Sequence, residues 1–255
     1  MKLGISYNLF DGEELLKDSI KSIRDNVDHI SIVYQTESNF GNPCSEELVP
    51  LINDLKSTGL VDEIYKYKPR VNKGGHYNEI TKRNIGLYLS EGAKCTHHMA
   101  MDSDEFYISE QFKYMCEVMT KEEYDSAACQ MVTYYKHSNY VLDPNEDYYV
   151  SLLFKIRQGK EYVLGIPFPV LVDPTRRMEP AHCKIFNREE IEMHHMSYVR
   201  NNIAIKLQNS SASPNFNNIN KVVEHFNNWE YPQQGLMFKP NEEYVTLKKI
   251  DKLFL

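Results

Sequence analysis

The first 122 residues alternate between short apolar runs and amphipathic segments, and this alternation limits the fold more than any other feature. Apolar runs typical of buried strands cover residues 2–7, 29–35, 61–67 and 95–102. Segments with apolar residues every three or four positions, typical of helices, lie between and after them, at residues 11–27, 46–57, 78–90 and from 109. The alternation predicts an α/β fold, with a mixed, mainly parallel central sheet and helices on both faces.

The pattern changes after residue 124. Runs at 126–135, 148–156 and 162–166 predict strands, and turns are predicted around Asp143-Pro144 and Gly159. We therefore expect one domain over residues 1–208, with a regular half (1–122) and a half of mixed strands and loops (123–208). Residues 209–255 are expected to form a C-terminal extension.

Three acids, Asp102, Asp104 and Glu105, follow the fourth predicted strand directly. Two carboxylates one residue apart on such a turn can bind Mg²⁺ or Mn²⁺ and leave positions open for phosphate oxygens. If the fourth strand returns beside the first, these acids lie next to Tyr7 and Asn8, at the switch point where doubly wound sheets bind ligands. For the motif alone, the alternative is a solvated turn that caps the next helix.

Composition excludes several classes of function. The net charge is -7 and no Lys/Arg-rich run occurs, which argues against nucleic acid as a partner. Five cysteines without a CxxC pair predict free thiols in a reducing compartment. No signal peptide or membrane span is evident, so we expect a cytoplasmic location. No glycine-rich fingerprint follows the first strand, so neither a dinucleotide fold nor a P-loop is predicted.

The order of the motifs resembles that of the GT-A glycosyltransferases, and in particular the family-two-like group. The matching motifs are Lys82-Arg-Asn-Ile-Gly-Leu87, the Asp-x-Asp motif Asp102-Ser-Asp-Glu105, and His195-Met-Ser-Tyr-Val-Arg200. The resemblance covers roughly the first two hundred residues. It implies a GT-A-like fold in which residues 1–122 bind a nucleotide sugar and residues 123–208 bind the acceptor. It also implies transfer of a hexosyl group from a nucleoside-diphosphate sugar, expected to be a UDP-sugar, to a glycan or lipid-linked acceptor in surface polysaccharide synthesis.

The resemblance implies roles for individual residues. Metal ligands for Mn²⁺ or Mg²⁺ are expected at Asp102, Asp104 and His195, since a neutral imidazole is an acceptable Mn²⁺ ligand. The residues expected to bind the nucleotide sugar are Tyr7, Asn8, Gln35, Arg83, Asn84, Asp102, Ser103 and Lys206. Gln35 stands where such enzymes often carry an acid, so the nucleotide is left open.

An inverting transferase needs a carboxylate near the acceptor hydroxyl. The segment expected to line that side, residues 167–182, offers Asp173 and Glu179 as base candidates. A retaining enzyme needs no such base, so the stereochemistry is left open too.

Two other functions compete with a transferase. A sugar-phosphate nucleotidyltransferase would need a glycine-rich loop after the first strand, which Leu9-Phe-Asp-Gly12 does not supply. A non-catalytic sugar- or nucleotide-binding module is the other. The lysine-containing segment 245–255 is a candidate amphipathic contact with an anionic membrane, and its alternative is docking on the protein's own core.

Overall fold

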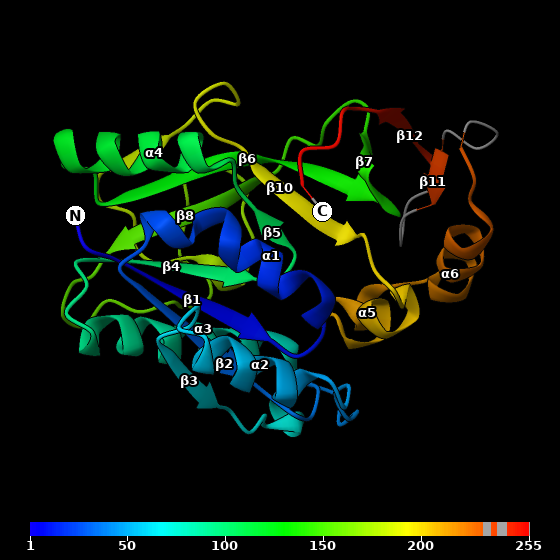
Figure 1. Ribbon diagram of the computed structural model, residues 1–255, viewed down its shortest axis with the longest axis horizontal. Helices are drawn as coiled ribbons and strands as arrows, with labels where there is room; N and C mark the ends of the chain where they lie inside the picture. Colours follow the sequence, from blue (N-terminus) through cyan, green and yellow to red (C-terminus); the bar gives the residue numbers. More distant parts are fainter. Residues whose placement is uncertain (232–235, 239–243, 255) are drawn as a thin grey trace.

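The computed structural model describes residues 1–231, 236–238 and 244–254 of the 255-residue chain (Figure 1). Its α-helices are α1 (Glu13–Ile23), α2 (Leu48–Ser57), α3 (Gly75–Gly92), α4 (Ser109–Lys121), α5 (Ile203–Asn209) and α6 (Ile219–Asn228). Its strands are β1 (Leu3–Leu9), β2 (His29–Tyr34), β3 (Glu63–Lys66), β4 (His97–Asp102), β5 (Glu105–Phe106), β6 (Ser126–Tyr135), β7 (His137–Leu142), β8 (Tyr149–Lys155), β9 (Cys183–Ile185), β10 (Met193–Tyr198), β11 (Leu236–Phe238) and β12 (Tyr244–Lys249).

One mixed sheet runs through the molecule in the order β11-β12-β7-β6-β8-β4-β1-β2-β3. The pairs among β1 to β4 are parallel, whereas β8 pairs antiparallel with both β4 and β6. Strand β10 adds to β6 in parallel, and the short β5 pairs with β10. The expected α/β class, with a mixed sheet between helices, is confirmed.

The two faces of the sheet are packed differently. Leu3, Ile5, Tyr7 and Leu9 of β1 share a buried core with apolar residues of α1, α2 and α4. The alternate residues of β1 face α3, which approaches very closely, because a Cβ on Gly86 would lie only 2.2 Å from Oγ of Ser6. This close packing fixes the side chains of α3 relative to the C-terminal end of β1.

The C-terminal residues continue the sheet. β12 pairs with β7, and Leu247 is buried with Trp229 and Phe226 in a satellite core. Docking on the protein's own core, the alternative to an amphipathic membrane segment, is therefore what the structure shows for residues 244–249. Residue 255 lies outside the described residues.

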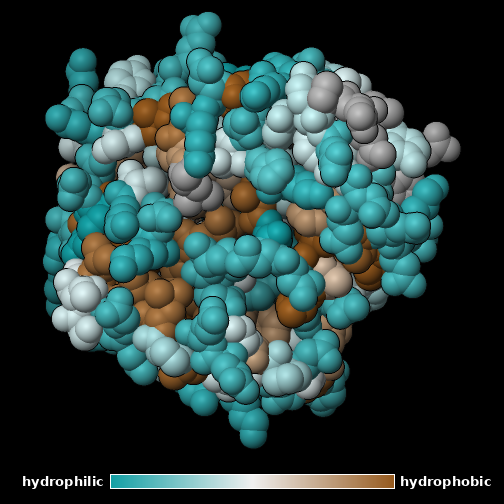
Figure 2. Space-filling model, turned by 45° about the vertical axis from the view of Figure 1, so that its right-hand side comes forward, coloured by the Kyte–Doolittle hydropathy of each residue, from teal (hydrophilic) through white to brown (hydrophobic). Residues whose placement is uncertain are grey.

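One predicted strand does not form. Tyr162, in the segment expected to be a strand at 162–166, instead packs its ring against Leu87 and Phe154. Hydrophilic residues cover most of the face shown in Figure 2, with hydrophobic residues visible in patches between them. Among the helices of the described chain, none combines the length and apolarity needed to cross a bilayer.

Candidate active site

A polar pocket lies at the C-terminal ends of β1 and β4. These strands are adjacent and parallel, and their register places Asn8 opposite Asp102. The sheet order reverses direction between them, since β2 follows β1 on one side and β4 adjoins it on the other. The predicted switch point is therefore present, and it is where ligands bind in open α/β sheets. In Figure 1 the arrowheads of β1 and β10 point toward α5, which closes this end.

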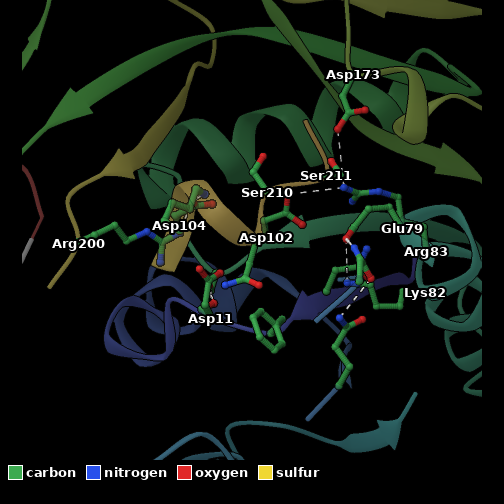
Figure 3. A pocket seen from close by; sticks show the side chains of 17 residues that line it. Asp11, Glu79, Lys82, Arg83, Asp102, Asp104, Asp173, Arg200, Ser210 and Ser211 are labelled. Carbon is green, nitrogen blue, oxygen red and sulfur yellow. Dashed lines mark hydrogen bonds and ion pairs between the residues drawn. The ribbon is translucent and has the colours of Figure 1, made fainter. Parts of the chain in front are cut away.

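The pocket is lined mainly by polar and charged side chains and opens to solvent. Its walls come from β1, α3, the turn after β4, and the segment through α5. Figure 3 shows the lining residues, which are Asn8, Phe10, Asp11, Gln35, Asn39, Glu79, Lys82, Arg83, Asp102, Ser103, Asp104, Asp173, Arg200, Lys206, Asn209, Ser210 and Ser211.

Asp104 is buried against two cations. Its Oδ2 accepts hydrogen bonds from Arg200 Nη2 at 2.5 Å and from Lys206 Nζ at 2.7 Å. Burial alone would raise the pKa of Asp104, but Lys206 and Arg200 hold that pKa well below its usual value. Asp104 is therefore ionised, and the two cations outnumber it.

Asp102 and Glu105 share a third cation. Arg176 Nη2 donates to Oδ2 of Asp102 at 2.6 Å and also to Oε1 of Glu105. Burial would raise the pKa of Asp102, yet Arg176 and Arg83 outweigh burial and lower it. Burial raises the pKa of Glu105 to about 7; Arg176 opposes this shift and Asp102 adds to it. One guanidinium shared by two carboxylates leaves one of them poorly compensated.

Several buried polar atoms around the pocket have no hydrogen-bond partner. Among the described residues these include Nε and Nη1 of both Arg83 and Arg200, both amide atoms of Asn8, and Oε1 of Gln35. Buried polar groups are normally hydrogen-bonded, and a buried donor or acceptor left without a hydrogen bond costs about 1–3 kcal/mol. The concentration of such atoms at one pocket indicates a site built for a polar ligand, and the two guanidinium groups indicate an anionic one.

A second pocket shares a wall with the first. Asp102, Asp173, Ser210 and Ser211 line both pockets. The further walls of the second pocket are formed by His76, Glu105, Met131, Tyr148, Tyr149, Val150, Pro174, Arg176, Met193, His195 and Ala212. The carboxylate of Asp173 thus stands at the boundary. Thr175 donates to its Oδ1 through both N and Oγ1, and its Oδ2 lies 3.9 Å from Arg83 Nη2.

The structure brings most of the predicted residues to the first pocket. Those found in its lining are Asn8, Gln35, Arg83, Asp102, Ser103, Asp104, Asp173 and Lys206. Four others lie elsewhere, and one of these, His195, lines the second pocket. Tyr7 is buried in the core and bonds Ser19, while Asn84 exchanges two hydrogen bonds with the backbone of Tyr162. Glu179 pairs with Lys160 on the surface.

The two adjacent histidines of β10 point in opposite directions, as expected for neighbours on a strand. His194 is buried, with Nδ1 2.9 Å from the Tyr134 hydroxyl. His195 lines the second pocket, and its Nε2 lies 3.7 Å from Oδ1 of Asp104. Burial lowers the pKa of His195 although Asp104 opposes the shift, so the imidazole is neutral at neutral pH.

The arrangement of these groups does not fit a divalent metal ion. The described residues contain no group of three His, Cys, Asp or Glu side chains placed to hold one. A metal on Asp104 would have to lie beside Arg200 and Lys206. Unit charges 4 Å apart interact by about 4 kcal/mol at an effective dielectric constant of 20, so two cations outweigh one carboxylate. The side chains of the predicted set, Asp102, Asp104 and His195, are therefore suitable metal ligands, but the cations around them would repel a divalent ion.

Arg176 and Arg200 were not predicted as site residues. Arg176 lies in the segment 167–182, where only carboxylates were sought, and it follows the Asp-Pro-Thr of the short 3-10 turn Pro174–Arg176. Arg200 ends the late histidine motif. The signal available was charge balance, because Asp104 and Glu105, which are buried, and the partly exposed Asp102 beside them require nearby cations.

Neither a protein-family model nor a curated protein matches the sequence. Among solved structures, the chain is similar to a fragment of S. aureus TarS, residues 1–349. The identity is 10%, the match covers 82% of this chain and 66% of that one, and the TM-score is 0.48. For the same fragment in complex with UDP-GlcNAc, the identity is 11%, the match covers 82% of this chain and 67% of that one, and the TM-score is 0.47. For GalNAc-T7 with UDP, GalNAc and Mn²⁺, the identity is 17%, the match covers 52% of this chain and 23% of that one, and the TM-score is 0.39.

The chain spans about two thirds of the TarS fragment and 40% of a longer TarS structure. At these identities and TM-scores, the similarities do not by themselves assign a function. The chemistry of the site has to do so.

Proposed function

We propose that this protein is a glycosyltransferase that takes a nucleoside-diphosphate sugar as donor, with a UDP-sugar as the first candidate. The sugar, a hexosyl group, would pass to a glycan or lipid-linked acceptor, as in surface polysaccharide synthesis. The observation that carries the proposal is the strand-end pocket in which unpaired guanidinium N–H groups of Arg83 and Arg200 lie near Lys206. Such donors match a diphosphate, and the amides of Asn8 and Gln35 offer polar partners for a base or ribose.

The two adjoining pockets support a transfer reaction better than simple binding. A donor in the first pocket and an acceptor in the second would meet at Asp173, which lines both. Tyr148 and Tyr149 of the second pocket offer aromatic surface for a sugar ring. A binding module needs only one of these pockets and no carboxylate between them.

The chemistry can be written with the residues at this boundary. Oδ2 of Asp173 accepts the proton of an acceptor hydroxyl as its oxygen bonds to the anomeric carbon of the donor sugar. The bond from that carbon to the diphosphate oxygen breaks, and its electron pair leaves with the diphosphate. Arg83, Arg200 and Lys206 stabilise the charge gained by the leaving group. This sequence corresponds to an inverting reaction.

The test is a screen of UDP-, GDP-, CDP- and ADP-sugars for release of the nucleoside diphosphate, combined with calorimetric titration of the four free diphosphates. Each is run in EDTA and with added Mn²⁺. We expect one diphosphate to bind and its sugar nucleotide to be hydrolysed slowly by water in the absence of acceptor. Binding without turnover of any sugar nucleotide would favour the binding module, and no binding of any diphosphate would remove the proposal.

A further inference from the structure

The cations around Asp104 exceed what that carboxylate needs. One oxygen, Oδ2, receives both Arg200 and Lys206, and the neutral His195 lies on the side of Oδ1. Figure 3 shows Arg200 extended toward Asp104 on one side of the pocket, while Arg83 lies between Asp102 and Asp173. Asp104, Arg200 and Lys206 therefore form a cluster with one more cation than carboxylate, and Asp11 and Glu14 also act electrostatically on Arg200.

The chain is shaped to hold Arg200 in this place. The Arg200 side chain is 3% exposed, and its Nε and Nη1 have no partner in the described structure. A Cβ on Gly12 would lie 1.8 Å from Arg200 Nη1, and Gly12 has a φ of 77°. Only glycine combines that backbone conformation with that clearance, so the turn after β1 is fitted around the guanidinium.

The other acid of the motif is compensated in the same way. Asp102 is held by Arg176 at 2.6 Å, and Arg83 lies 3.6 Å away. Each acid that the sequence suggests as a metal ligand therefore has a cation of the chain beside it. Together these cations supply the positive charge that a divalent ion would bring to a diphosphate.

We propose that this pocket binds the diphosphate of its nucleotide donor without a divalent metal ion, with Arg200 and Lys206 as the phosphate-binding cations and Asp104 as the group that positions them. The proposal rests on the function proposed above, from which its test is separable. Asp104 then acts on the donor only through its two cations.

The first test is calorimetric titration of the wild-type protein with UDP, GDP, CDP and ADP in EDTA and with Mn²⁺. We expect the preferred diphosphate to bind in EDTA with an affinity within about threefold of that in Mn²⁺. Binding seen only with Mn²⁺ would overturn metal independence but leave the transferase in place. Binding in EDTA without turnover of any sugar nucleotide would support metal-independent binding but overturn the proposed transferase activity. No binding in either condition would overturn both.

The second test is Asp104→Asn, for which the two ideas predict opposite results. A metal ligand lost at this position should abolish diphosphate binding. Asn keeps an amide oxygen that can accept from Arg200 and Lys206 and hold them in place, while it removes the negative charge that offsets theirs, so we expect affinity in EDTA to be retained or increased. Loss of binding by a variant whose circular dichroism matches that of the wild type would overturn the proposal.

The third test does not depend on Asp104. Lys206→Met keeps the length and apolar stem of the side chain and removes its charge, so we expect about tenfold weaker diphosphate binding in EDTA. Lys17→Met, on the exposed side of α1 and outside the described pockets, is the matched control. Equal affinities for the two variants would overturn the assignment of Lys206.

Discussion

At the scale of single residues, the site is a set of buried charges that depend on one another. Arg176 lies between Asp102 and Glu105 and is only 4% exposed. Removing one partner of a buried ion pair typically costs 3–5 kcal/mol, because the other charge is left uncompensated. These residues therefore affect folding as well as binding.

Asp173 is the residue for which a purely catalytic effect is expected. Asn at this position keeps Oδ1, so the hydrogen bonds from Thr175 can remain. The base is lost, and we expect Asp173→Asn to lower the rate of sugar transfer about hundredfold while diphosphate affinity changes little. Glu179→Gln is the control, since Glu179 pairs with Lys160 on the surface. Equal rates for wild type and Asp173→Asn would exclude Asp173 as the base.

Glu105 should make stability depend on pH. Its pKa in the folded protein is raised from 4.5 to about 7 by burial and by Asp102, against the effect of Arg176. An acid with a raised pKa binds its proton more tightly when folded, so its contribution is full below pH 4.5 and is lost as pH rises toward 7. We expect the free energy of unfolding, measured in urea, to fall less over this range in Glu105→Gln than in wild type. Parallel pH profiles would show that Glu105 does not titrate there.

At the scale of elements, the site depends on how closely α3 packs against β1. Lys82 and Arg83 lie about one turn before Gly86, the glycine that contacts Ser6. A second close contact, between Gly4 and Ser90, lies one turn further on. Two such contacts fix the helix along its length, which sets the position of Arg83 at the end of the sheet.

Gly86→Ala should disturb this packing. The new methyl group would lie 2.2 Å from Oγ of Ser6, so α3 must move away from β1. Overpacking of this kind costs about 1–3 kcal/mol, and the shift of Arg83 should also weaken diphosphate binding. Gly92→Ala, in the same helix, meets nothing within 4 Å and should be neutral or slightly stabilising. Thermal unfolding and calorimetry of the two variants together check both effects.

The helices and strands that could be predicted from sequence are those long enough to show a regular spacing of apolar residues. Helix α3 was predicted at 78–90 and covers Gly75–Gly92. The structure also meets the condition that the fourth strand lies beside the first, since β4 pairs with β1. The two-residue β5 is too short to show a period, and β7 and β12 were not predicted either. The pairing of β5 with β10 joins segments about ninety residues apart in sequence, which no local pattern encodes.

The site residues likewise divide into those that a local sequence pattern indicates and those that tertiary packing brings in. Asn8 and the three acids could be predicted because the ends of parallel strands meet at one edge. Arg176 and Arg200 come from connecting segments, and their positions depend on tertiary packing. The sequence therefore indicated the acids and two of the cations beside them, Arg83 and Lys206, but not Arg176 and Arg200.

At the scale of the whole molecule, the last residues reach back to the strands around the site. β12 continues the sheet beyond β7, and Ile250 and Phe254 then pack against a core that includes Phe106 and Met196. The Phe254 ring lies 5.4 Å from that of Phe106 and 4.9 Å from that of His194. Phe106 of β5 is paired with His194 of β10, and the next pair along these strands is Glu105 with His195.

Phe254 should therefore stabilise the strand pair that carries Glu105 and His195. Phe254→Ala removes ring contacts with Phe106 and His194, and for a half-buried ring we expect a loss of about 1–2 kcal/mol in the free energy of unfolding. Hydrogen exchange should become faster in β5 and β10, because local opening of this pair costs less. Exchange in β2 and β3, at the far end of the sheet, should not change. Leu253→Ala is the matched control, since that neighbouring side chain is 50% exposed and should tolerate truncation. Equal exchange rates in β5 and β10 for the two variants would show that the C-terminal segment adds no stability to the strands beside the pocket.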